Sequence, residues 1–242
     1  IRTAFVPSHD GWQIFSSDYS QVELRVLAHI TGDKNLQEDF KNGEDIHAST
    51  ARRIFHLGPD AEIDRNMRRR AKAVNFGIVY GISAFGLSED LSITRKEALE
   101  YINKYFETYP QVKIFLDGLV EHAKEQGYVT TMFGRRRPVP ELKSANFMQR
   151  SFGERVAMNS PIQGTAADII KIAMIRVDRR LREEGLSSRL ILQVHDELLV
   201  ETAVSELEQV KKILSEEMRQ AAKLKVELEI DMHSGNSWFE AK

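Results

Sequence analysis

Apolar and polar residues alternate near the start of the chain, and a helical pattern follows directly. Residues 12–17 alternate after Asp10-Gly11, which predicts a β-strand that ends at Asp18. The sequence Ser20-Gln21-Val22-Glu23 is a capping-box pattern, and an apolar stripe with helical spacing follows it up to Gly32. The pattern therefore predicts a strand that leads straight into a helix.

A helical periodicity then continues almost without interruption to about residue 128. Glycine and proline residues break it near positions 43, 58–59, 81, 109–110 and 127. Residues 128–132 and 137–140 flank Gly134, which predicts a short basic hairpin or an extended loop. Two helices are predicted next, over 146–159 and 161–184, because serine followed by proline suits the start of the second one.

The last part of the chain returns to strand patterns. Residues 190–194 and 197–201 predict two apolar strands that meet in a tight turn. A helix over 205–222 and a strand over 226–232 complete the predicted elements. Because strands lie towards both ends with a helical block between them, the sequence predicts one α+β domain with a helical insertion.

Composition limits the chemistry that this fold can carry. The chain has 242 residues, 42% of them hydrophobic, which is enough for one sizeable core with a large inserted subdomain. The absence of cysteine excludes disulfides, thiolate zinc sites and thiol nucleophiles, and it fits a reducing cytoplasm. No apolar run approaches membrane-spanning length and no secretory signal opens the chain, so we expect a soluble, cytoplasmic protein without a membrane partner.

Charge is informative only locally, because the formal net charge is −2. Five cations fall within residues 65–72, which contain no acid. In the helix predicted there, Arg68, Lys72, Phe76 and Tyr80 recur at every fourth position and so share one face. Two cations followed by two aromatic rings would suit a triphosphate, a sugar and a base. A solvated stripe on an amphipathic helix is the alternative, and the pattern alone leaves both open.

Two aspartates stand where predicted strands end. Asp18 closes the first strand, and Asp196 lies at the tip of the later hairpin. Because a sheet fixes the backbone at strand ends, two such carboxylates can converge, and oxygen ligands of this kind suit Mg²⁺ together with substrate phosphates. Aspartate is also common in turns for purely structural reasons, so neither residue is informative alone.

These residues belong to three longer motifs that resemble motifs A, B and C of family A DNA polymerases. The motifs are Asp18-Tyr19-Ser20-Gln21-Val22-Glu23-Leu24-Arg25, Arg68-x-x-x-Lys72-x-x-x-Phe76-Gly77-x-x-Tyr80-Gly81 and Val194-His195-Asp196-Glu197. The connecting sequence Asn159-x-Pro161-x-Gln163-Gly164-x-Ala166-Ala167-Asp168 resembles the family as well. The resemblance runs essentially from Arg2 to Lys242, and three motifs in the family's order and spacing make it specific.

The resemblance implies an α+β fold with an antiparallel-sheet palm and a large all-helical fingers insertion. The palm would comprise residues 1–38 and 146–242, and the fingers residues 39–145. The implied activity is that of a magnesium-dependent DNA-directed DNA polymerase of replication and repair, acting as a monomer. It adds deoxynucleoside triphosphates to the primer 3′-hydroxyl of primed template DNA and releases pyrophosphate. In this family the thumb and nuclease domains precede this region, and we expect nothing in these residues to replace them in gripping the duplex.

Metal and triphosphate binding are the first roles that the resemblance assigns. Asp18 and Asp196 would hold two Mg²⁺ ions, with the backbone carbonyl of Tyr19 as a further ligand. Arg68, Lys72 and His47 match positions that grip the incoming triphosphate, and Lys72 is also placed to supply a proton to pyrophosphate. Phe76 would pack on the nucleotide sugar, and Tyr80 would occupy or vacate the templating position.

The remaining matched residues have structural alternatives. Glu23 resembles the family's steric gate against ribose, and it is also the reciprocal member of the Ser20 capping box. Arg155, Asn159 and Gln163 match contacts to the primer and the nascent duplex, although Ser160-x-x-Gln163 is itself a capping-box pattern. His195 matches a contact to the primer end, and a turn histidine is otherwise solvated.

Two further charged features, one acidic and one basic, complete the site predictions. Glu197 lies beside the metal ligands and is not expected to be an obligatory ligand. The run 135–137 is all arginine and either meets template phosphates or faces water.

Two other classes of protein compete with this interpretation. A single-subunit phage-type RNA polymerase shares the two aspartates and the basic helix, but it lacks the acidic gate and carries tyrosine in place of Phe76. A nucleic-acid-binding module without catalysis would use the basic segments alone, and it would gain nothing from Asp18 and Asp196 facing phosphates.

Overall fold

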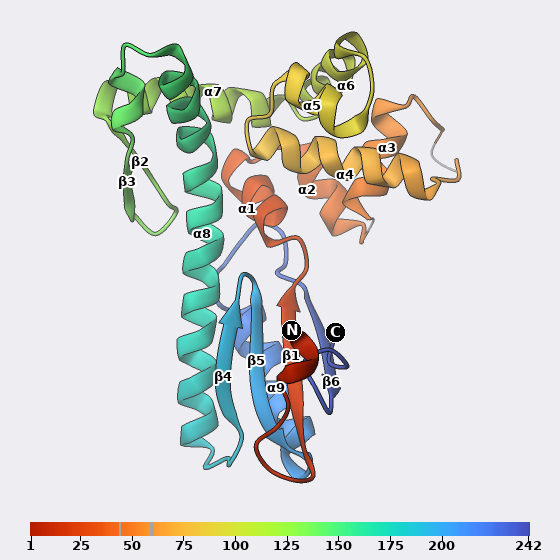
Figure 1. The fold of residues 1–242 in the computed structure, drawn as a ribbon, viewed down its shortest axis with the longest axis vertical. Helices are drawn as coiled ribbons and strands as arrows, with labels where there is room; N and C mark the ends of the chain where they lie inside the picture. The colour runs from red at the N-terminus through yellow and green to blue at the C-terminus, as the bar shows by residue number, and fades with distance from the viewer. Residues whose placement is uncertain (44, 59–60) are drawn as a thin grey trace. The chain divides into compact units, whose positions relative to one another are not determined.

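The computed structural model describes residues 1–43, 45–58 and 61–242 and separates into two compact units (Figure 1). Unit 1 contains residues 1–26 and 166–242, and unit 2 contains residues 27–165. The palm and fingers boundaries expected after residues 38 and 145 both fall within unit 2, so that division stays a prediction. Part of the break expected at 58–59 lies outside the described residues.

Unit 1 is built on a four-stranded sheet in the order β4-β5-β1-β6 (Figure 1). The strands are β1 (Trp12–Tyr19), β4 (Arg189–Val194), β5 (Glu197–Ala203) and β6 (Ile230–Gly235). Strand β1 pairs antiparallel with both β5 and β6. The mixed α+β architecture with an antiparallel sheet agrees with the predicted fold class.

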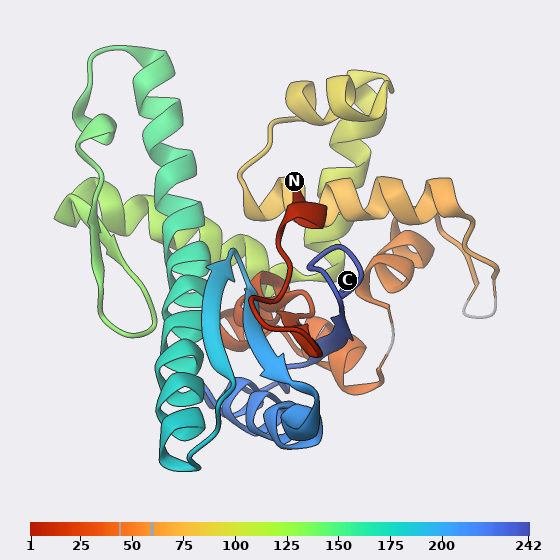
Figure 2. The same ribbon diagram turned by 60° about the horizontal axis from the view of Figure 1, so that its bottom comes forward.

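Both faces of this sheet are covered, which explains the apolar character of its strands. Helix α9 (Leu207–Arg219) covers one face, where the Tyr19 hydroxyl donates to the Met218 carbonyl at 2.6 Å. The part of α8 (Phe147–Glu183) that belongs to unit 1 runs alongside β4 (Figure 2). On the other face a buried cluster is formed by Ile14, Leu199, Trp238 and Ala241.

Unit 2 is mainly helical, and its helices begin where the sequence supplies caps. Side chains of Asp33, Asp45, Asp64, Ser83 and Thr94 accept backbone N–H groups at successive helix starts. The helices include α1 (Val22–Thr31, which begins in unit 1), α2 (Lys34–Lys41), α3 (Ile46–Ile54), α4 (Arg65–Val79), α5 (Ala84–Leu91), α6 (Arg95–Thr108) and α7 (Pro110–Gln126). The predicted basic hairpin is present as β2 (Tyr128–Thr130) and β3 (Arg136–Pro138). Short 3₁₀ turns are η1 (Arg2–Ala4), η2 (Pro140–Lys143) and η3 (Val204–Glu206).

The prediction of two helices around Pro161 was wrong, because α8 is one helix of 37 residues with this proline inside it. Proline removes one backbone hydrogen bond, which normally favours a break. Here Ala157, Ile162 and Thr165 on either side are all fully buried, so packing holds the helix through the proline. The capping box expected at Ser160 therefore does not mark a helix start.

The last strand was also misplaced, since β6 covers Ile230–Gly235 instead of residues 226–232. Strand β1 ends at Tyr19, which pairs with Ile230, so residues before Ile230 have no partner on β1. Val226 and Leu228 are nevertheless buried, which produced the alternating pattern without a ladder. Burial alone therefore does not distinguish a strand from an extended, packed loop.

Close packing beside β6 gives a test of this part of the fold. A Cβ on Gly235 would lie 2.5 Å from Glu240 Cβ and 3.0 Å from the backbone nitrogen of Ala241. We expect Gly235→Ala to lower the free energy of unfolding by about 2 kcal/mol, because the backbone of the following turn must move. Gly118→Ala is the control: it lies exposed within α7 with open space at Cβ, and helix propensity should make it stabilising by about 0.5–1 kcal/mol. Chemical denaturation measures both, and equal stabilities would show that the turn adapts.

Candidate functional site

Two aspartates meet at one end of the unit 1 sheet. Asp18 lies on β1 opposite Glu197, the first residue of β5. Only His195 and Asp196 separate β4 from β5, and His195 adopts φ +53°, which makes the turn tight. The Tyr19 N–H donates to the Asp196 carbonyl at 3.1 Å, so the turn is fastened to β1. Strand pairing and turn geometry together bring the two side chains close enough to hydrogen-bond.

The electrostatics of this pair favour a bound cation. The pKa of Asp18 is raised to about 7. Burial is the largest cause, the charge and hydrogen bond of Asp196 and the charge of Glu197 act in the same direction, and Lys242 opposes them. The Oδ1 atom of Asp18 is buried and has no hydrogen-bond partner among the described residues. A divalent cation would satisfy this oxygen and remove the repulsion between the carboxylates, and all the donors are hard oxygens.

The protein offers this cation few ligands of its own. Across residues 1–43, 45–58 and 61–242, no cluster of three or more histidine, aspartate or glutamate side chains has a metal-binding arrangement. Mg²⁺ is commonly held by one or two carboxylates and completed by water and substrate phosphates. The pair of Asp18 and Asp196 fits that pattern better than it fits a closed structural metal site.

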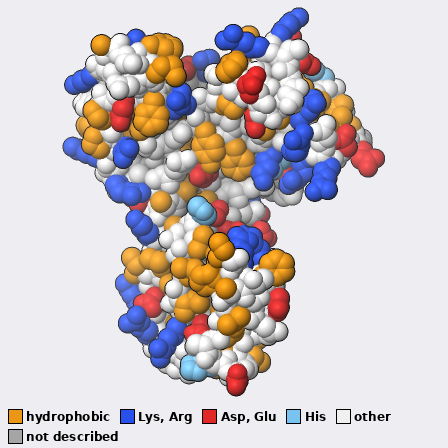
Figure 3. All heavy atoms as spheres, viewed as in Figure 1, with side chains coloured by type: hydrophobic (Ala, Val, Ile, Leu, Met, Phe, Trp, Pro, Cys, Tyr) orange, Lys and Arg blue, Asp and Glu red, His pale blue; other side chains and the backbone are white. Residues whose placement is uncertain are grey.

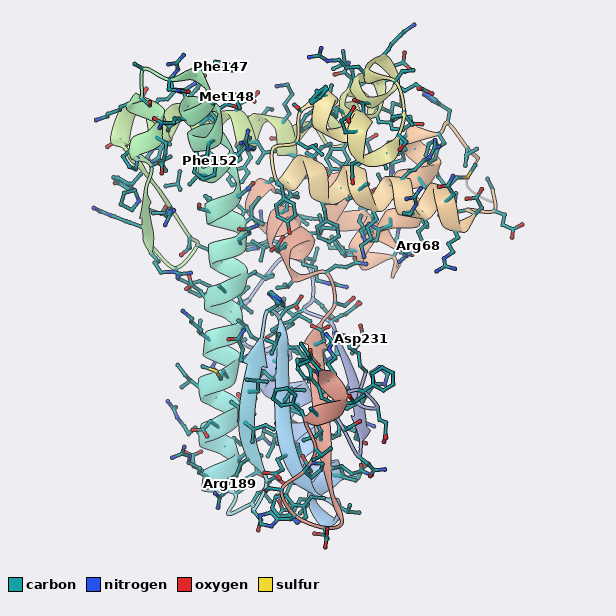
Figure 4. The ribbon with its side chains drawn as sticks, in the orientation of Figure 1. Arg68, Phe147, Met148, Phe152, Arg189 and Asp231 are labelled. Carbon is teal, nitrogen blue, oxygen red and sulfur yellow. The ribbon has the colours of Figure 1, made fainter. Side chains whose placement is uncertain are left out.

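Glu197 was predicted to lie beside the metal ligands, but the other groups around the pair were not predicted from the sequence. Glu197 is buried, and its Oε1 accepts hydrogen bonds from Ser16 Oγ at 2.6 Å and from Trp238 Nε1 at 2.8 Å. The register of β6 places Asp231 directly opposite Asp18 at the same end of the sheet (Figure 4). The strand order and register bring these residues together, and neither can be read from local sequence.

In unit 2 the four-residue repeat on α4 forms a continuous exposed face. Arg68 and Lys72 are exposed, Phe76 is half-buried and Tyr80 is 36% exposed, whereas Val74 and the other apolar residues of the opposite face are buried. Lys72 Nζ lies 5.9 Å from the centre of the Phe76 ring, and the Phe76 and Tyr80 rings stack at 6.2 Å. Lysine and arginine side chains gather over α3 and α4 (Figure 3). The cations and rings thus lie in the order that the repeat predicted.

Arg68 already has an anionic partner. Its guanidinium forms an ion pair with Asp45 (Figure 4), which also caps α3 by accepting the His47 N–H at 2.9 Å. The hydrogen bond and charge of Arg68 lower the pKa of Asp45 against the opposing effect of burial. A phosphate approaching this end of α4 would meet a cation that is positioned by a carboxylate.

His47 joins this face from α3 as a neutral ring. It is 3% exposed, its ring centre lies 5.7 Å from that of Phe76, and Asn75 Nδ2 donates to its Nδ1 at 3.0 Å. At the other end of this amide, Asn75 Oδ1 accepts from Thr50 Oγ1 at 3.1 Å. Burial lowers the pKa of His47 to about 4, and the charges of Arg68 and Lys72 act in the same direction while Asp45 opposes them. The remaining proton is therefore on Nε2, which can donate one hydrogen bond.

Three of the four residues predicted to contact DNA share one face of α8 in unit 2. Arg155, Asn159 and Gln163 follow at intervals of four, with Arg155 and Gln163 exposed and Asn159 half-buried. The Asn159 amide nitrogen donates to the Val79 carbonyl at 2.6 Å, so this residue also ties α8 to the end of α4. Gly81 allows the close approach, because it has φ +67° and a Cβ there would lie 2.5 Å from Met158 Cε.

Exposed apolar side chains lie beside these residues on the first turns of α8. Phe147, Met148 and Phe152 are 70%, 71% and 48% exposed (Figure 4). The Arg155 guanidinium lies 5.9 Å from the centre of the Phe152 ring. No role was predicted for these three residues from the sequence.

The remaining predicted residues belong to unit 1. His195 is exposed at the β4–β5 turn, and its carbonyl accepts from Gln193 Nε2 at 2.6 Å. Glu23 lies in the first turn of α1, and the Ser20 N–H, which a capping box would direct to Glu23, donates to the Glu229 carbonyl at 2.9 Å. The carboxylates, Tyr19, Glu23 and His195 are thus in unit 1, and the basic and aromatic faces are in unit 2.

Comparisons with known proteins agree with this combination of residues. The model of the family described as DNA polymerase family A matches residues 1–240. The chain is 57% identical over 242 residues to DNA polymerase I of Geobacillus stearothermophilus and 56% identical over the same length to that of Bacillus subtilis (strain 168). The alignments cover 100% of this chain and 28% and 27% of those proteins, so the chain spans little more than a quarter of their length.

A solved structure resembles the fold closely. It is described as the POL domain of Pol1 from M. smegmatis in complex with DNA primer-template and dNTP. The TM-score is 0.94 at 44% identity, and the match covers 100% of this chain and 42% of that one. Within the residues that the structure describes, no helix has both the length and the apolar character needed to cross a membrane.

The neutral state of His47 predicts a pH dependence of stability. The folded protein binds this proton only near pH 4, whereas the unfolded chain binds it below its ordinary pKa of 6.5. The stability contribution is therefore complete above pH 6.5 and is lost as the pH falls from 6.5 towards 4. Between pH 7.5 and pH 5, wild type should lose about 2 kcal/mol more unfolding free energy than His47→Asn.

The matched control for this measurement is His56→Asn, which makes the same change at an exposed histidine of unit 2. Its backbone has φ +57°, a conformation that asparagine tolerates. Denaturation of this control should follow the wild-type pH profile. A His47→Asn profile parallel to wild type would mean that His47 titrates as a solvated group.

Proposed function

Because the chain belongs to DNA polymerase family A, we propose that it is the polymerising part of a DNA-directed DNA polymerase. It adds deoxynucleoside triphosphates to the primer 3′-hydroxyl of a primed template and releases pyrophosphate. Its palm would comprise residues 1–38 and 146–242 and its fingers residues 39–145, so unit 1 lies within the proposed palm and unit 2 contains the proposed fingers. The observation that carries this proposal is that Asp18 and Asp196 lie together at the sheet end, with one buried oxygen of Asp18 lacking a hydrogen-bond partner among the described residues.

The residues of the pair fit a divalent metal site. Asp18 and Asp196, with the Tyr19 carbonyl, would hold two Mg²⁺ ions. When bound, the metal supplies positive charge that lowers the pKa of the primer 3′-hydroxyl and stabilises the departing pyrophosphate. The protein's own task here is to hold two carboxylates in one fixed place, which the β1–β5 pairing and the tight turn accomplish.

The α4 face binds the nucleotide by position and charge. Arg68 and Lys72 contact the triphosphate, and the Nε2–H of His47 donates to it without adding a charge. Lys72 is also the group that gives a proton to pyrophosphate. Phe76 packs on the sugar, and Tyr80 alternates with the templating base. The observed order of cations and stacked rings along one helix face supports these assignments.

The remaining assignments concern the sugar and the duplex. Glu23 crowds a ribose 2′-hydroxyl and so selects deoxynucleotides. Arg155, Asn159, Gln163 and His195 contact the primer and the nascent duplex, and their exposed or half-buried polar groups support this role. We further propose that the protein acts as a monomer and that it acts in the cytoplasm. The lack of cysteine supports the second point, since it fits a reducing compartment.

Removing either metal carboxylate should abolish synthesis without unfolding the protein. In the polymerase that contains this chain, Asp18→Ala and Asp196→Ala should each reduce primer extension in Mg²⁺ by roughly 10³-fold or more, because a ligand of the reaction centre is lost. Asp10→Ala, an exposed carboxylate just before β1, is the control and should extend primers normally. Near-normal extension by a folded Asp18 or Asp196 variant would rule out the proposed metal site.

The position of Phe76 on the sugar predicts a change in substrate selection. A phenyl ring cannot compensate for a missing 3′-hydroxyl, whereas a tyrosine there brings a hydroxyl of its own. Phe76→Tyr should leave normal synthesis almost intact and raise dideoxynucleotide incorporation relative to deoxynucleotide by at least about tenfold, the value of one hydrogen bond near 1.4 kcal/mol. Phe106→Tyr on α6, also half-buried, makes the same change away from α4 and should leave the ratio unaltered. An unchanged ratio in Phe76→Tyr would return this face to the solvated-stripe interpretation.

A further inference from the structure

The indole of Trp238 reaches the acidic end of the sheet from the segment after β6. Its Nε1–H donates to Glu197 Oε1 at 2.8 Å, and Ser16 Oγ donates to the same oxygen at 2.6 Å. Lys242 Nζ lies 3.8 Å from the other carboxylate oxygen, Oε2. Glu197, Ser16 and Trp238 are 3%, 4% and 7% exposed, so this carboxylate is held by donors in a place that water barely reaches.

The indole has little freedom to move away from Glu197. Its ring packs into the buried cluster that includes Ile14 and Leu199. Phe5 meets it edge-on with the ring centres 5.4 Å apart, and the Arg2 guanidinium lies 4.8 Å from its centre. The Trp238 backbone N–H donates to the Phe5 carbonyl at 2.9 Å. The direction of the Nε1–H bond is therefore set by packing on several sides.

Glu197 is a neighbour of both proposed metal ligands. It follows Asp196 in the chain and faces Asp18 across the β1–β5 ladder. A carboxylate at this position can either turn towards a bound cation or stay on the sheet as a fixed negative charge. Two donors on Oε1 favour the second arrangement, since turning would leave a buried indole N–H without an acceptor.

We propose that Trp238 is a positioning residue of the polymerase: through its hydrogen bond it holds Glu197 on the sheet as a fixed negative charge beside Asp18 and Asp196. This inference rests on the proposed function of the pair. The fixed charge strengthens binding of the divalent cation while leaving the ligand positions to the two aspartates. A purely structural tryptophan would contribute to stability and leave the metal requirement unaffected.

The test removes the N–H donor and keeps an aromatic ring. In the full-length polymerase, Trp238→Phe should raise the half-saturating Mg²⁺ concentration for primer extension roughly fivefold to tenfold, part of the value of a hydrogen bond to a charged group. The dissociation constant for Mn²⁺, measured by electron paramagnetic resonance without turnover, should rise by a similar factor. The deoxynucleotide KM at saturating Mg²⁺ should stay within about twofold, since no nucleotide contact is lost.

Trp12→Phe is the matched control. It makes the same change on β1, at the opposite end of the strand from Asp18, where Trp12 contacts His9. It should leave both metal measurements at wild-type values. A rise in the control equal to that in Trp238→Phe would assign the effect to general loosening of the sheet and would overturn the proposal.

A double-mutant cycle shows whether Trp238 acts through Glu197. Glu197→Gln keeps an acceptor oxygen for the indole and loses the charge, so it should fold and should itself raise the Mg²⁺ requirement. In that background Trp238→Phe should add less than about twofold, because the charge that it positions is gone. Equal factors in both backgrounds would overturn the proposal, as would an unchanged Mg²⁺ requirement in folded Trp238→Phe or Glu197→Gln. Failure of the proposed function would appear separately, as extension by Asp18→Ala.

Discussion

The antiparallel pairing of β1 with β5 is the constraint on which the proposed chemistry depends. The register that sets Asp18 opposite Glu197 also brings the β4–β5 turn to the end of β1, where the Tyr19 N–H fastens it through the Asp196 carbonyl. A shift of one residue would move Asp18 to the α9 face of the sheet. Cross-strand apolar contacts, including Ile14 with Leu199 in one buried cluster, oppose such a shift. The packing of the core therefore holds the carboxylates of Asp18 and Asp196 close together despite their mutual repulsion.

The neighbouring carboxylates of Glu197 and Asp18 differ in how far the protein satisfies them with hydrogen-bond donors. Glu197 is buried with donors to one oxygen and a lysine near the other, so the protein itself supplies the hydrogen bonds that hold its charged carboxylate in place. Asp18 has a buried oxygen without a partner among the described residues, and its pKa is raised to about 7. Burial of an uncompensated carboxylate is unfavourable, and a cation is the natural source of compensation. At this end of the sheet, Glu197 thus has its hydrogen bonds supplied by the protein, whereas Asp18 keeps an oxygen available to a cation.

Those parts of the fold and of the candidate site that depend on local periodicity could be predicted from the sequence. The α4 face follows from a spacing of four, and the ends of β1 and the β4–β5 hairpin follow from alternation and a tight turn. The missed features depend on long-range packing. Burial on both sides of Pro161 carries α8 through a residue that normally ends a helix, and the length of β1 decides where β6 begins. Trp238 lies 41 residues from Glu197 along the chain, so no local pattern could connect them.

The α4 face solves a different electrostatic problem from that of the sheet end. Arg68 pairs with Asp45, so one strong cation on this face is already neutralised before any phosphate arrives. The proposed binding of a triphosphate there would replace Asp45 by a phosphate or let the two share Arg68, so it would not require a fully solvated cation to be desolvated. His47 is kept neutral by burial and by the nearby cations, so it adds a directional N–H without adding repulsion to Arg68 and Lys72. The positive charge of this face is therefore carried by Arg68 and Lys72, while the buried ring of His47 offers a hydrogen-bond donor with a fixed direction.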